Sequence, residues 1–343
     1  MWHSAGVWFA GCHPGFDGIL NSFRGKILVI RGGAIGDFIL TLPAIAALRQ
    51  AFPHAHLEVL GYSHIVELAV AGGLANQARS IDARPLAAFF ARNGELGEEM
   101  RDYFSEFDLI VSYLYDPDTI FQTNVSRCSP AQFIAGPHRP DEKANTHATR
   151  VFLRPLERLA IFNADPMPRL RIGGSHSSSK TVSAKPDDVP TLALHPGSGS
   201  ESKNWPEERW AELLEWFLNE TRFRLLIVGG EAEGARLQSL AAALPPARTR
   251  VAQNQPLPEL AALLAGCAGF IGHDSGISHL AAAVGLSGLL LWGDTNEEIW
   301  RPPSESFVLV RGPGGLGDLG VDLVREEVRR LWGALLVSSG GFP

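Results

Sequence analysis

Residues 25–53 read GKILVIRGGAIGDFILTLPAIAALRQAFP, and this stretch decides the expected fold. Its apolar, β-branched first part ends in two glycines, which predicts a buried parallel strand that leaves through a tight turn. Apolar residues then recur near helical spacing, and Pro53 lies just past the expected helix end. The stretch is therefore a strand–turn–helix unit, the repeating element of α/β domains.

The same alternation continues along the chain and restarts once. Strands are predicted at 55–62 and 107–114, with a short helix at 64–73. Residues 173–190 are rich in Gly, Ser, Pro and charge, and no apolar period survives there, which indicates a linker. Beyond it, apolar runs and amphipathic stretches alternate again. We predict α/β architecture with two Rossmann-like doubly wound domains that face a central cleft, since ligands of such folds bind where strands end.

The length of 343 residues also fits two domains of ~150 residues each. The expected division is an N-terminal extension (1–24), a first Rossmann-like domain (25–172), the linker (173–190), a second Rossmann-like domain (191–320) and a C-terminal helix (321–343).

Composition excludes several functions. The net charge is −7, and acidic residues outnumber basic ones in both halves, which argues against nucleic-acid binding. Cys12, Cys128 and Cys267 are odd in number and far apart, so they predict no disulfide framework and a reducing compartment. No apolar stretch is long enough to span a bilayer, and the N-terminus lacks the features of a signal peptide. We expect a cytoplasmic protein.

The first junction with potential chemistry is RGGAIGD, residues 31–37. Gly33 and Gly36 allow the backbone to approach a ligand, and Asp37 lies near the first turn of the helix. Asp37 either caps this helix, where acids are favoured, or presents a carboxylate to the cleft. The spacing is neither GxGxxG nor GxxxxGK[ST], which argues against a dinucleotide fingerprint and a P-loop.

The second junction is HPGSGSESKNWP, residues 195–206. Backbone N–H groups of its Gly/Ser turn, the hydroxyls of Ser198 and Ser200, and the ammonium of Lys203 could converge on one anion. Taken alone, Lys203 is equally explained as an exposed surface lysine.

The third junction is GHDSGISHLAAAVG, residues 272–285. Asp274, Ser275 and Gly276 stand at a helix start, where free N–H groups and the helix dipole favour phosphate. His279 follows one turn later and could donate a hydrogen bond or charge. At a fourth junction, Glu231 could accept two ribose hydroxyls or cap the next helix.

Together these loops indicate a nucleotide-diphosphate donor in the second domain and a base in the first. At these four junctions no Asp-x-Asp pair or His/Asp/Glu cluster offers a divalent metal site, so Lys203 and the helix start would have to neutralise the diphosphate. Two alternatives remain open at this point: an NAD-dependent oxidoreductase, disfavoured by the missing GxGxxG, and a catalytically silent nucleotide-sugar-binding protein.

Four segments carry a family resemblance: residues 27–62, 194–214, 225–233 and 270–302. In this order they resemble glycosyltransferase family 9, the ADP-heptose:lipopolysaccharide heptosyltransferases. The resemblance implies metal-independent, inverting transfer from an ADP-sugar, which is a co-substrate, to a lipid-linked or oligosaccharide acceptor. It further implies the GT-B arrangement, with the acceptor side in residues 25–172, donor binding in residues 191–320 and a last helix that packs back toward the N-terminal domain. A lipid-linked acceptor would require transient contact with the inner face of the inner membrane, and we expect a monomer.

Position by position, the resemblance assigns Asp37 as the catalytic acidic residue, Lys203 as the diphosphate lysine and Glu231 as the ribose ligand. It places Asp274, Ser275, Gly276 and His279 at the diphosphate and the donor sugar. The chain departs from the family at Gly33 and Ala34, where hydroxyl residues are usual, and in WGDTNEEIW (292–300). A phosphorylated acceptor would need a basic groove in the first domain, for which the available arginines are Arg31, Arg79, Arg84, Arg92 and Arg139.

Overall fold

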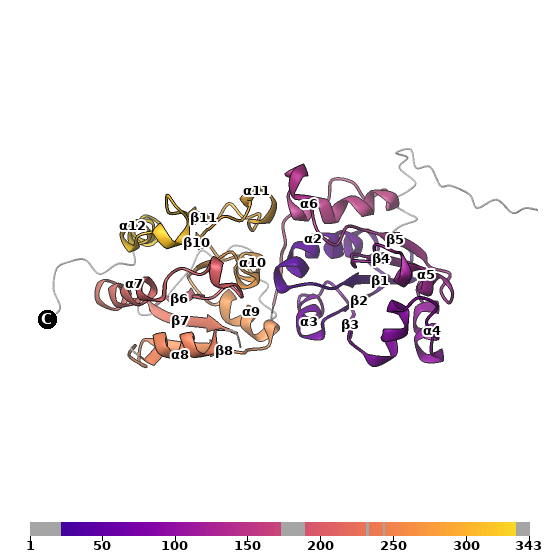
Figure 1. The fold of residues 1–343 in the computed structure, drawn as a ribbon, viewed down its shortest axis with the longest axis horizontal. Helices are drawn as coiled ribbons and strands as arrows, with labels where there is room; N and C mark the ends of the chain where they lie inside the picture. Colours follow the sequence, from indigo (N-terminus) through magenta and orange to yellow (C-terminus); the bar gives the residue numbers. More distant parts are fainter. Residues whose placement is uncertain (1–21, 173–188, 231–232, 243, 334–343) are drawn as a thin grey trace, which may run out of the picture.

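The computed structural model describes residues 22–172, 189–230, 233–242 and 244–333. The expected N-terminal extension up to residue 21, the linker between 173 and 188, and the C-terminal residues from 334 onward lie outside these residues. The described chain forms two α/β domains that lie side by side along the longest axis of the molecule (Figure 1).

The first domain contains a five-stranded parallel sheet in the order β3-β2-β1-β4-β5. Its strands are β1 (Lys26–Arg31), β2 (His56–Gly61), β3 (Gln77–Ser80), β4 (Leu109–Ser112) and β5 (Gln132–Ala135). Its helices are α2 (Ile35–Ala51), α3 (Ser63–Ala71), α4 (Glu98–Ser105), α5 (Ile120–Ser126) and α6 (Ala148–Leu153), with short 3-10 turns at Arg84–Phe90, Glu142–Ala144 and Arg154–Leu159.

The second domain contains a six-stranded parallel sheet in the order β11-β10-β9-β6-β7-β8. Its strands are β6 (Thr191–Leu194), β7 (Arg224–Gly229), β8 (Thr249–Gln253), β9 (Gly269–His273), β10 (Gly288–Leu291) and β11 (Phe307–Val310). Its helices are α7 (Glu207–Glu220), α8 (Gly234–Ala242), α9 (Leu257–Ala265), α10 (Gly276–Ala283), α11 (Glu297–Trp300) and α12 (Val321–Trp332), with 3-10 turns at Glu201–Lys203 and Leu316–Asp318.

The apolar run in β1 explains why its sheet is buried on both faces. Ile27 and Val29 point into a core built with α2, α3 and α6. Leu28 and Ile30 point the other way, into a core of aromatic side chains from the Arg84–Phe90 turn, α4 and α5. Alternate residues of a strand face opposite sides of the sheet, so an uninterrupted apolar run is what a doubly covered parallel strand requires.

Both sheets reverse strand order at one point, β1/β4 in the first and β6/β9 in the second. Such a switch point leaves a crevice at the carboxyl ends of the strands. The two crevices open toward each other, and buried side chains of α2 and α3 join those of α9 and α10 in one apolar cluster across the domain boundary. The prediction of two doubly wound domains around a central cleft is thereby confirmed.

The expected return of the last helix to the first domain is wrong for the residues described. The apolar side of α12 packs into the core of its own domain through Val324, Val328 and Trp332. The Trp332 ring lies over Gly269, where a Cβ would come within 2.4 Å of the ring, and meets Phe223 edge-on. Because α12 finds its partners on the second sheet, it lies at the far end from the first domain (Figure 1).

Candidate functional site

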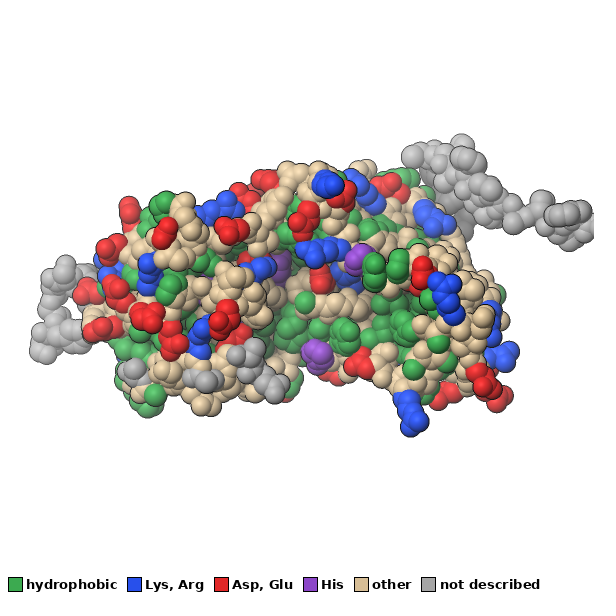
Figure 2. All heavy atoms as spheres, in the orientation of Figure 1, with side chains coloured by type: hydrophobic (Ala, Val, Ile, Leu, Met, Phe, Trp, Pro, Cys, Tyr) green, Lys and Arg blue, Asp and Glu red, His purple; other side chains and the backbone are tan. Residues whose placement is uncertain are grey.

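A cleft of about 1060 Å³ lies between the two domains at the carboxyl ends of both sheets. It is lined by loops that follow β1, β4 and β5 on one side and β6, β9 and β10 on the other. Basic, acidic and histidine side chains meet near the middle of the molecule (Figure 2). The cleft therefore brings together the three junctions that carry polar residues in the sequence.

At the first junction, Asp37 stands in the first turn of α2 and faces the cleft. Its Oδ2 accepts a hydrogen bond from the backbone N–H of Ala34 at 3.1 Å. Gly33 has a φ of 102°, and a Cβ there would lie 2.9 Å from Asp37 Oδ2, so both the backbone and the carboxylate require glycine. Asp37 thus caps the helix and also presents its carboxylate to the cleft.

Arg31 lies behind Asp37 and was considered in the sequence only as part of a basic groove. Its side chain is almost fully buried, with Nη1 donating to the carbonyls of His138 at 2.8 Å and Tyr113 at 3.3 Å. Its Nη2 is 3.5 Å from Asp37 Oδ1, and the guanidinium stacks on Phe152. Burial is the main influence on the Arg31 pKa and lowers it from its usual value. An arginine still remains charged, so Asp37 provides its counter-ion and is held in place.

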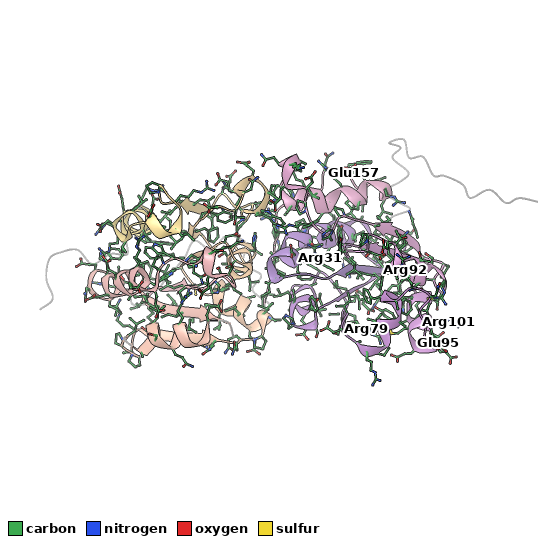
Figure 3. The ribbon with its side chains drawn as sticks, viewed as in Figure 1. Arg31, Arg79, Arg92, Glu95, Arg101 and Glu157 are labelled. Carbon is green, nitrogen blue, oxygen red and sulfur yellow. The ribbon has the colours of Figure 1, made fainter. Side chains whose placement is uncertain are left out.

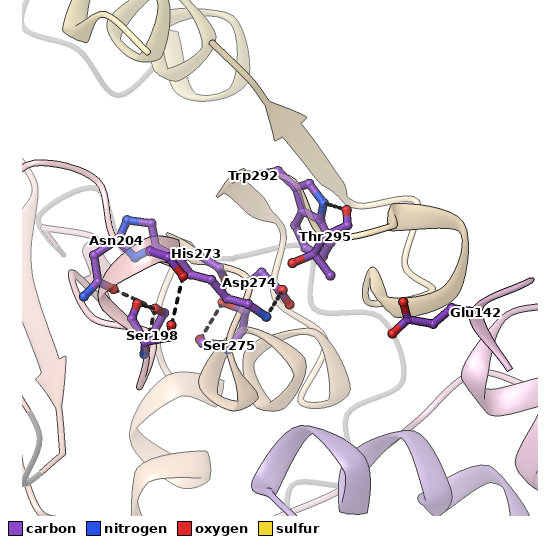
Figure 4. A network of polar contacts seen from close by, with 12 residues as sticks. Glu142, Ser198, Asn204, His273, Asp274, Ser275, Trp292 and Thr295 are labelled. Atoms are coloured by element: carbon purple, nitrogen blue, oxygen red, sulfur yellow. Dashed lines mark hydrogen bonds and ion pairs between the residues drawn. The ribbon is translucent and has the colours of Figure 1, made fainter. Parts of the chain in front are cut away.

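At the second junction, Ser198 and Lys203 line the cleft. The Ser198 hydroxyl lies 2.7 Å from both Asn204 Oδ1 and the Ser200 carbonyl, and so fixes the turn (Figure 4). Ser200 does not line the cleft. Its hydroxyl lies 3.1 Å from that of Ser202. Of the two serines predicted to converge on an anion, Ser198 therefore lines the cleft and Ser200 does not.

Lys203 is not a free surface lysine. Its Nζ lies 2.6 Å from Oδ2 of Asp274, which belongs to the third junction. The ion pair joins the turn after β6 to the turn after β9, and the lysine side chain stays 41% exposed toward the cleft. The two sequence-predicted residues thus form one charged unit.

At the third junction, Ser275 is the N-cap of α10, and its Oγ accepts from the Ser278 N–H at 3.3 Å. The same oxygen lies 3.2 Å from His195 Nδ1. Gly276 abuts the first domain, because a Cβ there would come 2.7 Å from Ile35 Cβ and 3.0 Å from the Gly36 nitrogen. The starts of α2 and α10 are therefore in direct contact across the cleft.

His279 is buried one turn into α10, and its ring packs against Gly36, where a Cβ would lie 3.2 Å from Cδ2. Burial lowers the pKa of His279 to about 4, with smaller opposing influences from Asp274 and Asp37. The imidazole is therefore neutral near pH 7. Of the two roles expected for His279, it suits a hydrogen bond and not a positive charge. Its Nδ1 has no hydrogen-bond partner among the described residues.

The expected ribose ligand Glu231 lies outside the described residues. Its neighbour Glu233, which the sequence did not single out, is buried and accepts from the Gly230 N–H at 2.8 Å. A Cβ on Gly197 would come 2.1 Å from Glu233 Cγ, so this acid packs directly under the turn that leads to Lys203.

Sequence reasoning missed the outer rim of the cleft. Asn145 Oδ1 accepts from Asn296 Nδ2 at 2.9 Å, and His147 Nε2 lies 2.8 Å from the Arg301 carbonyl. Arg139 stacks over Trp300, with 5.2 Å between the guanidinium carbon and the ring centroid. These contacts join loops of the two domains, and the sequence signals near them were the departure of residues 292–300 from the family pattern and Arg139 as a candidate for a basic groove.

The five arginines do not assemble into a basic groove. Arg31 and Arg139 line the cleft, whereas Arg79, Arg84 and Arg92 do not. Arg79 lies over the Tyr103 ring and Arg92 pairs with Asp118, at positions well away from Arg31 (Figure 3).

The residues that the structure describes contain no group of three or more His, Cys, Asp or Glu side chains that could hold a metal ion. Within the same residues, no helix is both long enough and apolar enough to cross a bilayer.

Comparisons with known proteins bear on this architecture. The model of glycosyltransferase family 9 (heptosyltransferase) matches residues 149–315. Lipopolysaccharide heptosyltransferase 3 of Escherichia coli K12 is 23% identical over 80% of this chain and 84% of its own length. Lipopolysaccharide heptosyltransferase 1 of Pseudomonas aeruginosa is 25% identical over 79% of each.

Solved structures agree in fold. A family 9 glycosyl transferase of Veillonella parvula superposes with a TM-score of 0.70 at 18% identity, over 91% of this chain and 99% of that one. E. coli ADP-heptose LPS heptosyltransferase II gives 0.69 at 19% identity, over 89% and 98%. The resemblance seen in the four sequence segments is confirmed, and a glycosyltransferase is favoured over an oxidoreductase or a silent binding protein.

Proposed function

We propose that this chain, which is similar to glycosyltransferase family 9, transfers a heptose or a related sugar from an ADP-sugar to a lipopolysaccharide-core-type acceptor. The relatives named for lipopolysaccharide heptosyl transfer support this donor and acceptor. We further propose that transfer inverts the anomeric centre, needs no metal, and takes place in the cytoplasm beside the inner membrane, where a lipid-linked acceptor is presented.

One observation carries the proposal: a carboxylate and an anion site face each other across a contact between two helix starts. Asp37 belongs to α2, and Lys203, Asp274 and Ser275 surround the start of α10. Gly276 touches Ile35 and Gly36, which sets the spacing between the two sites. A donor that lies with its diphosphate at α10 would bring its sugar toward Asp37.

Asp37 is proposed as the general base. The acceptor hydroxyl attacks the anomeric carbon from the face opposite the diphosphate, and its proton passes to the Asp37 carboxylate. The new bond from carbon to the acceptor oxygen forms as the bond to the phosphate oxygen breaks, which inverts the centre. Ala34 N–H and Arg31 hold the carboxylate, and such positioned bases contribute about 10²–10⁴-fold to the rate.

Lys203 and the start of α10 are proposed to stabilise the leaving diphosphate. The first N–H groups of a helix lack intrahelical partners and, with the dipole, favour an anion. Lys203 is paired with Asp274, so donor binding would transfer the ammonium from the carboxylate to the phosphates. This exchange frees Asp274 to accept hydroxyl groups of the donor sugar. Glu231 remains the predicted ribose ligand.

The donor assignment is tested by thermal unfolding with ADP, UDP, GDP and CMP. A ligand at a hundred times its Kd stabilises the protein by about 2.7 kcal/mol, which raises the midpoint measurably. We expect the largest shift with ADP, and ADP-heptose transfer to a core oligosaccharide acceptor with inverted configuration by NMR. Equal shifts for all four nucleotides would overturn the ADP assignment, and a retained configuration would overturn the proposed role of Asp37.

A further inference from the structure

The cleft contains more carboxylates than cations. Its charged lining residues, among those the structure describes, are Arg31, Asp37, Arg139, Glu142, Lys203, Asp274 and Asp294. Each cation is paired within the cleft: Arg31 with Asp37, Lys203 with Asp274, and Arg139 with Glu142 at 2.7 Å. Asp294 remains as an additional negative charge.

Only one of these cations is available to an acceptor. Arg31 is buried behind Asp37, and Lys203 belongs to the proposed diphosphate site. Arg139 lies in the first domain at the rim, between Glu142 and the Trp300 ring. The Arg139–Glu142 pair is exposed and weak by itself, but a phosphate at Arg139 would also lie close to the Glu142 carboxylate and be repelled.

An exposed aromatic ring stands on the same wall. Tyr115 follows β4, lines the cleft, and is 71% exposed, more than any other large hydrophobic side chain among the described residues. Its ring lies 4.6 Å from the His138 ring, centroid to centroid, with 59° between the ring planes, so the imidazole supports it from one side. The other large aromatic side chains of this domain pack into its core or lie away from the cleft. A supported, exposed ring beside polar groups fits a ligand with both apolar faces and hydroxyls.

We propose that Tyr115, His138 and the Arg139–Glu142 pair form the subsite for an uncharged acceptor sugar ring, which stacks on Tyr115 and hydrogen-bonds to the charged pair. The inference rests on the proposed glycosyl transfer and specifies its acceptor: the ring that enters beside Asp37 carries hydroxyls and no phosphate. Paired charges of opposite sign can donate to and accept from hydroxyls without demanding a net charge on the ligand.

Tyr115→Ala tests the stacking surface. We expect the KM for a deacylated core oligosaccharide to rise about tenfold, in line with loss of one aromatic contact, while the KM for ADP-heptose and the Kd for ADP stay unchanged. Tyr115→Phe should retain acceptor affinity. Tyr62→Ala is the matched control, since Tyr62 is also an exposed tyrosine of the first domain but does not line the cleft. An unchanged acceptor KM in Tyr115→Ala would overturn the subsite.

Glu142→Gln tests whether the Glu142 carboxylate disfavours a phosphorylated acceptor. The same oligosaccharide is assayed in two forms, as purified and after enzymatic dephosphorylation. The wild-type enzyme should use the dephosphorylated form at least as well as the phosphorylated one. In the variant, Arg139 loses its counter-ion, so kcat/KM for the phosphorylated form should rise about fivefold relative to the dephosphorylated form. A wild-type preference for the phosphorylated form that disappears in Arg139→Gln would overturn the proposal.

Failure of this inference and failure of the proposed function give different results. If the enzyme binds ADP and transfers heptose, but Tyr115 and Glu142 variants behave as wild type, only the acceptor subsite is wrong. If ADP does not bind to the wild type, the proposed function itself fails, and the subsite that depends on it is refuted with it.

Discussion

The helices α2 and α10 begin in the same way and differ in the charge that they bring to the cleft. Each follows a buried parallel strand, and the two starts touch through Gly36 and Gly276. At α2 the N-cap is Ala34, and the acid of the first turn, Asp37, accepts the cap N–H. At α10 the N-cap Ser275 satisfies a first-turn N–H with a neutral hydroxyl.

This difference gives two similarly placed helix starts different chemical roles. An acid inside the first turn offsets the positive end of the helix dipole, so α2 presents a carboxylate. A neutral cap leaves the dipole available, and Lys203 adds an ammonium, so α10 favours an anion. We infer that the side chains at the cap and in the first turn, rather than the fold, decide which helix start serves as base and which as phosphate site.

Asp37→Asn should have the largest effect, because it removes the carboxylate but keeps the capping oxygen. We expect kcat to fall by about 10³-fold, with the Kd for ADP unchanged. Stopped assays of heptose transfer and calorimetric titration with ADP measure the two quantities. A variant with wild-type kcat would remove Asp37 from catalysis and leave it only as a helix cap.

Lys203→Ala should lower kcat/KM by about 10²–10³-fold, since a preorganised cation at a leaving group is lost. Most of the loss should fall on kcat, because the charge on the leaving oxygen grows in the transition state. Lys26→Ala is the matched control: Lys26 is 42% exposed and paired with Glu106, as Lys203 is 41% exposed and paired with Asp274. If both variants lose activity equally, Lys203 has no special role.

Acidification should act on the α10 side through its buried histidines. Burial lowers the pKa of His195 to about 4, below the value of about 6.5 expected for an unfolded chain. Between these pH values His195 is protonated in the unfolded state but not in the folded state. The free energy of unfolding therefore falls as the pH falls from about 6.5 to 4. His195→Gln should reduce the slope of unfolding free energy by about 1.4 kcal/mol per pH unit in that window. Urea denaturation at several pH values measures the slope, and parallel curves for variant and wild type would contradict this assignment.

Ser275→Ala should have the smallest effect of the four. Loss of an N-cap hydroxyl costs about 1 kcal/mol of folding stability, and the freed N–H would remain next to the proposed diphosphate. Ser126→Ala serves as the control, because its hydroxyl bonds a carbonyl within α5 at an exposed position, and we expect a change within about 0.5 kcal/mol. Chemical denaturation of the two variants decides between them.

Local sequence was sufficient to predict the junctions. Asp37 and Ser275 stand next to glycines, Lys203 follows a Gly/Ser turn, and all three come shortly after strands whose carboxyl ends lie together in parallel sheets. The surroundings of Arg31 were not predictable, because its partners come from the loops after β4 and β5 and from α6 and α2. Tyr115 and Trp300 belong to different domains, so their place at one cleft depends on domain packing. The amphipathic pattern of α12 predicts a buried side but does not identify the sheet that covers it.

The contact of Gly276 with Ile35 and Gly36 gives the molecule a pivot. A methyl group at residue 276 would meet Ile35 Cβ at 2.7 Å, so the two domains are as close here as their backbones allow. Apolar side chains shared by α2, α3, α9 and α10 continue this contact below the cleft. The rim at Arg139, Asn145 and His147 is joined to the other domain by ring and polar contacts instead. A rotation of the domains about the Gly276 contact would therefore widen the entrance at this rim and leave the separation between Asp37 and the start of α10 nearly unchanged.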